Sequence, residues 1–206
     1  MYITRLRLNR SRMAVLWVSN PYHVHQRLKM ACDGDPRLLF RIEESADGVQ
    51  ILVQSHNAPH WEAAFEDFPV LASPPEYKSF DPQLTAGKVY RFRLLANPTV
   101  KKTVEDEGKE PHKTRLGLVR EEDQIAWLRR KLVTAGVEVL DCLIVPQGLQ
   151  RSHKNPQRQD GMQTHLAVLF EGVLLAKDPY LLRQAIDSGV GSAKGFGFGL
   201  LSIAPM

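Results

Sequence analysis

Tyr22 and His25 are the two side chains whose types and spacing best suit proton-transfer chemistry. They lie near the start of NPYHVHQRLKMA, residues 20–31, where an asparagine N-cap followed by proline is typical of a helix start. Residues three apart on a helix are neighbours on one face, so Tyr22 and His25 should lie side by side. His23 and His25 would be about 200° apart, so this helix cannot offer both to one metal ion.

Such a pair suits cleavage of RNA without a metal ion. One group must take the proton from a 2′-OH and another must protonate the leaving 5′-oxygen, and histidine can do either near neutral pH while tyrosine donates a hydrogen bond. The helix start also offers free N–H groups to a phosphate. Residue types alone favour the simpler alternative of solvated side chains, and they leave open whether His25 would act first as base or as acid.

A glycine-rich segment near the C-terminus, GVGSAKGFGFG, is the second candidate. Its backbone could approach a phosphate closely, with Lys194 as a point charge, or it could simply form a tight crossover from helix to strand; both can hold together. It opens like the RNP1 pattern of RNA-recognition motifs, but Gly199 and Leu201 break that pattern, and its spacing does not fit a dinucleotide fingerprint. The glycines concerned are Gly189, Gly191, Gly195, Gly197 and Gly199.

A basic stretch at residues 150–161 reads as a loop that could follow phosphates, although basic surface loops are common. Its cations are Arg151, Lys154 and Arg158. The histidines of HNAPH, residues 56–60, lack a third partner and enclose a proline, which argues against zinc. We therefore expect neither a metal nor a cofactor.

The helices and strands that must position these residues follow a similar order twice along the chain. In the first, strand patterns cover 2–8, 37–44, 48–56 and, weakly, 75–82, with helix patterns at 20–32 and 61–68. In the second, strand patterns cover 88–99, 137–146, 162–176 and 197–205, with helix patterns at 121–136 and 178–191 and a charged loop at 101–115. The order βαββαβ, repeated, predicts an α+β protein of two tandem ferredoxin-like domains, at 1–82 and 87–206.

Composition sets broad limits on function. With 206 residues, of which 43% are apolar, the chain can bury a substantial core. A net charge of +4 permits nucleic acid as a partner without requiring it. Two cysteines without C-x-x-C spacing suggest buried thiols in a reducing compartment. The N-terminus alternates like a strand, and the longest apolar stretch is too short to span a bilayer, so we expect a soluble, intracellular protein.

Five segments, taken in order along nearly the whole chain, resemble the CasE-type CRISPR repeat-RNA endoribonucleases of type I-E Cascade, in the RAMP superfamily. They are NPYHVHQRL, YRFRLLANPT, QIAWLRRKL, VLFEGVL and GVGSAKGFGFGLLSIAP. The resemblance implies tandem ferredoxin-like domains related to RNA-recognition folds. It implies binding of the CRISPR repeat stem-loop, metal-independent cleavage of the precursor at the 3′ base of the stem by 2′-OH attack, and retention on the mature RNA. Other Cascade subunits would be partners, and the free protein would be a cytoplasmic monomer.

The resemblance also implies roles for particular residues. The family's Tyr-x-x-His corresponds to Tyr22 and His25, and His23 between them receives no role. Lys194 takes the lysine position of the glycine-rich terminus, although serine stands where the family usually has proline. A basic residue after the histidine is either Arg27 or Lys29, while the cations of the basic stretch are assigned by charge and position alone.

Two other functions fit parts of the same sequence. One is a non-catalytic RNA-binding subunit of the same complexes, against which the Tyr22 and His25 pair argues; a cleavage assay separates the two. The other is a ferredoxin-like module that binds a nucleotide or metabolite at the glycine-rich terminus. A bound mononucleotide, with no affinity for structured RNA, would favour this last function.

Overall fold

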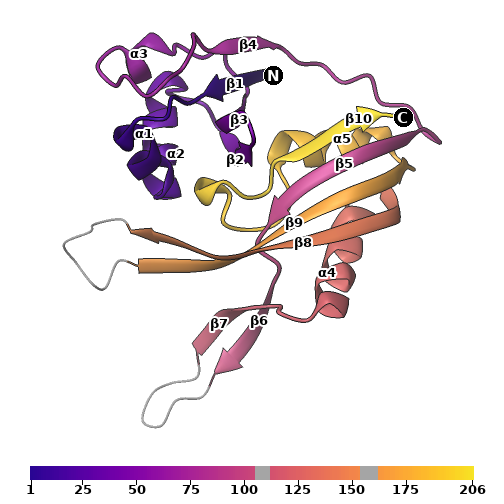
Figure 1. Cartoon of the computed structure of the whole chain (residues 1–206). Helices are drawn as coiled ribbons and strands as arrows, with labels where there is room; N and C mark the ends of the chain where they lie inside the picture. Colours follow the sequence, from indigo (N-terminus) through magenta and orange to yellow (C-terminus); the bar gives the residue numbers. More distant parts are fainter. Residues whose placement is uncertain (105–111, 154–161) are drawn as a thin grey trace.

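The computed structural model describes residues 1–104, 112–153 and 162–206, and its described part contains two four-stranded antiparallel sheets and a two-stranded ribbon (Figure 1). The first half contains β1 (Tyr2–Arg7), α1 (Arg12–Val18), α2 (Pro21–Ala31), β2 (Leu39–Ser45), β3 (Gly48–Ser55), α3 (Glu62–Phe65) and β4 (Glu76–Ser79). The second half contains β5 (Val89–Ala96), β6 (Thr99–Val104), β7 (His112–Gly117), α4 (Glu121–Val133), β8 (Val137–His153), β9 (Met162–Ala176), α5 (Pro179–Ser188), the 3₁₀ helix η2 (Lys194–Phe196) and β10 (Leu201–Pro205).

The two sheets share one strand order, and this confirms the predicted pair of ferredoxin-like units. The first sheet runs β2-β3-β1-β4 and the second runs β10-β5-β9-β8. When only the strands of each sheet are counted in chain order, both sheets have the first and third strands at the centre and the second and fourth at the edges. The first sheet ends at Ser79 and the second begins at Val89; the finer domain limits, 1–82 and 87–206, stay a prediction.

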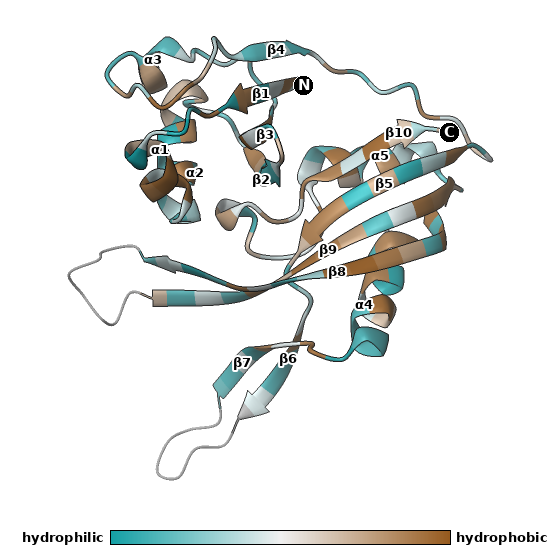
Figure 2. Cartoon of the chain, viewed as in Figure 1, coloured by the Kyte–Doolittle hydropathy of each residue, from teal (hydrophilic) through white to brown (hydrophobic). Residues whose placement is uncertain are grey.

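Each sheet buries one face under helices and so has its own core. In the first half, Leu6, Phe40 and Ile51 of the sheet pack with Leu28 of α2. In the second half, the apolar side chains of β5 and β9 pack with those of α4 and α5. Figure 2 shows the alternation of hydrophobic and hydrophilic residues along β5. Alternation along β5, with Tyr90, Phe92 and Leu94 buried between exposed basic residues, is what selects the covered face.

Two predicted loops are partly strand, which corrects the sequence analysis. The stretch 101–115 was expected to be loop, yet it contributes to β6 and β7, which pair with each other as an antiparallel ribbon that extends away from the second sheet (Figure 1). β-branched residues such as Thr99, Val100 and Thr103 favour this ribbon. The basic stretch 150–161 also begins as strand, because β8 continues to His153 and stays paired with β9.

Helix α1 was not predicted at all. Ser11 caps it by accepting a hydrogen bond from the Ala14 N–H, at 3.2 Å. Only Ala14 and Trp17 of this helix are buried, so its apolar pattern is too short to show a clear period. Of the residues that the structure describes, none belongs to a helix long and apolar enough to cross a membrane.

Gly172 of β9 should be required for the second sheet. It pairs with Cys142 beside an irregularity in the register of β8, and a Cβ atom at this position would overlap the Asp141 carbonyl oxygen and stand 2.9 Å from Cys142 Cα. Because backbone would have to move, we expect Gly172→Ala to lower the free energy of unfolding by about 1–3 kcal/mol in urea titrations. The control Thr164→Ala, exposed on the same strand, should stay within about 0.5 kcal/mol; equal stability of both variants would contradict this packing.

Candidate functional site

Helix α2 holds Tyr22 and His25 on one side and is tied to the second half at its first turn. The Asn20 side chain caps the helix by accepting from the Tyr22 N–H, at 3.3 Å. The amide nitrogen of the same side chain donates to the His153 carbonyl oxygen of β8, at 3.0 Å. The cap that starts the helix therefore also fixes it to the long β8–β9 ribbon.

The His25 ring lies between β2 and the glycine-rich segment. It stacks on Phe40 with ring centroids 6.1 Å apart. On another side, a Cβ atom on Gly195 would stand 3.5 Å from His25 Cε1, so the glycine backbone comes close to the imidazole. Burial lowers the pKa of His25, and the positive charge of Lys29 lowers it further. Both effects favour the neutral ring, which is the form that can accept a proton.

Tyr22 is positioned from the opposite half by Phe196 of η2. The two rings stack with centroids 6.3 Å apart, and the Tyr22 hydroxyl accepts from Gln26 Nε2 at 3.3 Å. Phe196 is itself fixed by Gln150 of β8, whose amide donates to its carbonyl oxygen at 2.7 Å, and by the His165 ring at 4.7 Å between centroids. Sequence analysis did not identify Phe196 or His165, because only the fold brings them to α2.

The glycine-rich segment is a tight crossover from α5 to β10. Gly191, Gly197 and Gly199 all have φ near +88°, a conformation that L side chains rarely adopt. A Cβ on Gly197 would stand 3.2 Å from Phe40 Cε2. The simpler interpretation of this segment as a tight turn is therefore correct, and the same turn places Gly195 against His25.

The structure distinguishes the two cations that follow His25. Arg27 faces α3, where it donates to the Ala64 carbonyl oxygen at 3.0 Å and to Asp67 at 3.1 Å, and its guanidinium lies over Phe68. Lys29 is exposed, and its charge acts on His25. Lys29 is therefore the cation of this pair that is available beside the candidate site.

The remaining predicted cations lie on two flanks. Lys194 of η2 is half-buried, and its pKa is lowered by burial and then by the charges of Arg37 and Lys131. Arg151 is exposed on β8 and lines a cleft of about 620 Å³ between the two halves. Lys154 and Arg158 lie outside the described residues.

A basic groove beside the glycine-rich segment was missed in the sequence. A hollow of about 220 Å³ adjoins Gly191 and Ser192 and is lined by Lys101, Arg115, Arg130 and Lys131. Lys131 also lines a neighbouring hollow with Lys194. The sequence signal was present, since α4 carries Arg130 and Lys131 in its last turn, but basic residues also suit a helix end without any ligand.

The described part of the chain offers acid–base groups rather than a metal cage. Among its residues, no three His, Cys, Asp or Glu side chains gather closely enough to hold a metal ion. Burial raises the pKa of the thiols of Cys32 and Cys142 to about 11, so neither thiol is an activated nucleophile. The chemistry that this geometry supports is proton transfer at the His25 ring, with a tyrosine hydroxyl alongside.

Comparisons with known proteins agree along the whole length. The family model described as CRISPR associated protein matches residues 1–205. The chain is 36% identical to the CRISPR-associated endoribonuclease Cse3 of Thermus thermophilus and 31% identical to the CRISPR system Cascade subunit CasE of Escherichia coli, in each case over 100% of both chains.

Two solved structures extend the likeness to three dimensions. Cse3 bound to a 19-nucleotide RNA superposes with a TM-score of 0.83 at 32% identity, over 100% of both chains. Thermus thermophilus Cse3 bound to an RNA representing a pre-cleavage complex superposes with a TM-score of 0.78 at 33% identity, over 99% of this chain and 98% of that one.

The effect of Lys29 on the neighbouring ring can be measured directly. Replacing Lys29 by glutamine removes a positive charge that disfavours the imidazolium, so the pKa of His25 should rise toward its ordinary value. The rise should be partial because burial, the larger cause, remains. NMR titration of the His25 ring measures it, with Arg27→Gln as the control on the face toward Asp67. An equal rise in both variants, or none in either, would contradict this arrangement.

Proposed function

The chain belongs to the family of CRISPR-associated proteins that includes Cse3 and CasE, and from this membership we propose that it is an endoribonuclease of CRISPR RNA. It binds the stem-loop of the CRISPR repeat and cleaves the precursor at the 3′ base of the stem. It then stays on the mature RNA as a subunit of Cascade, acting in the cytoplasm. Free of RNA it is a monomer of two domains, 1–82 and 87–206, and it needs no metal and no cofactor.

One observation carries the proposal. Tyr22 and His25 lie three residues apart on α2, and the glycine-rich segment of the other half contacts both, Phe196 at the tyrosine and Gly195 at the histidine. A glycine beside an imidazole leaves space in which a phosphate could approach the ring. This arrangement supports a role in catalysis over RNA binding alone.

The proposed reaction is attack of a 2′-OH on the adjacent phosphorus. The new bond joins the 2′-oxygen to phosphorus, the bond from phosphorus to the 5′-oxygen breaks, and the products are a 2′,3′-cyclic phosphate and a 5′-OH. The neutral state favoured at His25 supports the role of base, in which it takes the 2′ proton. The Tyr22 hydroxyl donates a hydrogen bond to the leaving 5′-oxygen and passes it a proton, which solvent then replaces on the tyrosine, and Lys29 offsets the charge of the phosphate.

Basic side chains on both flanks would hold the RNA stem. Lys194 and Lys131 lead from the glycine-rich segment into the groove beside β6 and β7, and Arg151 lies on the other flank with Lys154 and Arg158 beyond it in sequence. Because the deep major groove of an A-form stem is poorly accessible to side chains, contacts to phosphates and shape should dominate affinity. Arg27 is assigned to the contact with α3 rather than to RNA.

The direct test of the proposal is replacement of His25. His25→Ala should slow cleavage of a repeat hairpin by about two to four orders of magnitude, because the group that moves the proton is lost. The hairpin dissociation constant should stay close to that of the unaltered protein. Single-turnover rates at saturating protein, beside a filter-binding titration, measure the two quantities separately.

The matched control is His23→Ala on the same helix. His23 lines a separate hollow with α1 residues such as Met13 and Leu16, so its loss should leave both rate and affinity unchanged. Cleavage at the normal rate by His25→Ala would contradict the catalytic role of His25. Tight binding with no cleavage by the unaltered protein would instead favour an RNA-holding subunit.

A further inference from the structure

The glycine-rich segment crosses the edge of the first sheet at β2 and contacts both of its faces. On the face that carries the first core, Gly197 approaches Phe40. On the opposite face, a Cβ on Gly189 would stand 2.9 Å from the Leu39 side chain. Leu39, Arg41 and Glu43 alternate along this second face of β2, which is the face that meets the other half of the molecule.

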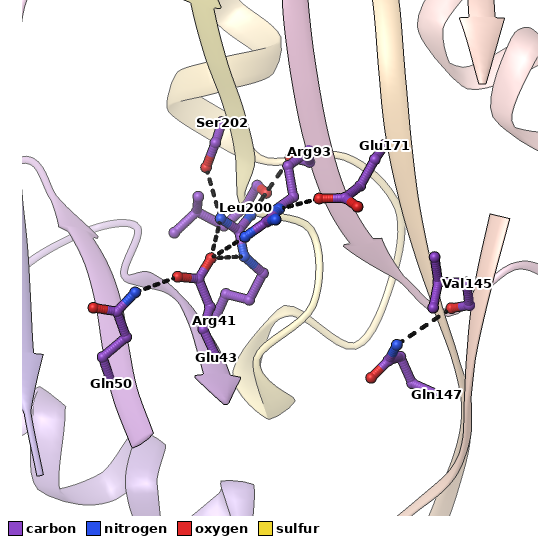
Figure 3. A network of polar contacts seen from close by, with 9 residues as sticks. All are labelled: Arg41, Glu43, Gln50, Arg93, Val145, Gln147, Glu171, Leu200 and Ser202. Carbon is purple, nitrogen blue, oxygen red and sulfur yellow. Dashed lines mark hydrogen bonds and ion pairs between the residues drawn. The ribbon is translucent and has the colours of Figure 1, made fainter. Parts of the chain in front are cut away.

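Arg41 is buried on that second face and satisfies all of its donors. It is 3% exposed, and Figure 3 shows its guanidinium among groups from both halves. Within β2, Nε and Nη2 donate to Glu43 Oε1, at 2.8 and 2.6 Å. Toward the other half, Nη1 donates to the Leu200 and Arg93 carbonyl oxygens, at 3.1 and 3.4 Å, and Nη2 donates to Ser202 Oγ, at 3.0 Å. Five bonds use the five N–H groups that a guanidinium has.

A second side chain of the first sheet reaches the opposite end of the same segment. Gln54 of β3, paired with Leu39 in the sheet register, is 1% exposed. Its amide donates to the Ile186 carbonyl oxygen of α5 at 2.8 Å. The bond from Gln54 lies just before the glycine-rich segment and the bond from Arg41 lies just after it, so the segment is held at both ends.

We propose that Arg41 is a positioning residue for the proposed cleavage. Together with Gln54 it fixes the two ends of the glycine-rich segment, so that Gly195 packs against His25 and Phe196 packs against Tyr22. The inference rests on the proposed function for its catalytic consequence. Its structural part, that Arg41 keeps the segment against His25, stands on the contacts of the protein alone.

The bonding pattern favours positioning over simple stabilisation. A buried ion pair is weak evidence for stability, because desolvation offsets much of the attraction. Arg41 and Glu43 could pair within one strand without touching the second half, yet three of the five bonds go to Leu200, Arg93 and Ser202. Only a planar fork of five donors serves all these acceptors at once, and lysine cannot.

The first variant is therefore Arg41→Lys, which keeps the charge and removes the fork. Misplacement of a site by about 1 Å can cost about 100-fold in rate, so we expect the cleavage rate at saturating protein to fall by about 10- to 100-fold. The dissociation constant of the hairpin should change by less than about threefold, because Arg41 is buried and is not one of the exposed cations proposed to hold the RNA. A fall in affinity with an unchanged saturated rate would overturn the proposal.

The matched control is Glu171→Gln. Glu171 belongs to the same polar network but bonds to Arg93 on its own sheet, away from β2 (Figure 3). Its loss should leave the saturated rate unchanged. If both variants lost rate equally, the effect would belong to the charge of the network, and the specific role of Arg41 would be contradicted.

A double variant separates positioning from folding. Arg41→Met combined with Glu43→Leu removes the buried pair as a unit, a change that is often neutral for stability. Thermal unfolding should then stay near that of the unaltered protein while the saturated rate still falls. A folded double variant that cleaves at the normal rate would overturn the proposal.

Titration of His25 without RNA tests the structural part independently of cleavage. The groups packed against this ring are Phe40 from β2 and Gly195 from η2. The nearby charges are Lys29 on its own helix and Lys194, the neighbour of Gly195 in sequence, and Tyr22 lies three residues before His25. Loosening the segment in Arg41→Lys should expose the ring and raise the pKa of His25 toward its ordinary value. An unchanged pKa would overturn the positioning role, whereas failure of the unaltered protein to cut RNA would overturn only the proposed function.

Discussion

The approach of a glycine backbone to the rings of His25 and Phe40 is the contact on which the candidate site depends. Gly195 faces the imidazole and Gly197 faces the phenyl ring of Phe40, and the phenyl ring in turn stacks on His25. A side chain at Gly197 would need both an unfavourable backbone conformation and space that Phe40 occupies. Small residues here therefore let a segment of the second half complete a site that begins on a helix of the first.

This contact also sets the electrostatics of the site. The ring of His25 is partly withdrawn from water, which disfavours its charged form, and Lys29 adds to the effect from one turn further along the helix. A neutral imidazole next to cationic side chains can take a proton while its neighbours hold a phosphate. Lys29, the cation proposed to offset the charge of the phosphate, thus also helps to keep the proposed base neutral.

Part of the fold and of the candidate site could be predicted from the sequence, and part could not. The helix at Tyr22 and His25 was predictable because an N-cap, a proline and a helical period agree locally, and the repeated strand and helix patterns predicted both sheets. The ribbon of β6 and β7 was missed because its charged residues look like loop, although strand pairing satisfies its backbone. The contacts of Gly195, Phe196 and Arg41 join residues far apart in the chain, and no local pattern specifies such contacts.

The roles of the basic residues were likewise only partly predictable from the sequence. Charge alone could not choose between Arg27 and Lys29, because both follow His25 on one helix. The choice depends on the segment that follows α3, whose Asp67 and Phe68 hold the guanidinium of Arg27 on another face. Likewise, Arg41 in the sequence is one basic residue of an edge strand, and only the docking of the second sheet buries it.

The most direct measurement of the central claim, cleavage by side-chain acid–base chemistry on a 2′-OH, is a gel assay in EDTA. The protein is incubated with a repeat hairpin and, in parallel, with the same hairpin carrying a single 2′-deoxy sugar at the 3′ base of the stem. The account predicts that the first RNA is cut and that the second is bound but stays intact. Cleavage of the deoxy hairpin, or cleavage of the first only when Mg²⁺ is restored, would contradict it.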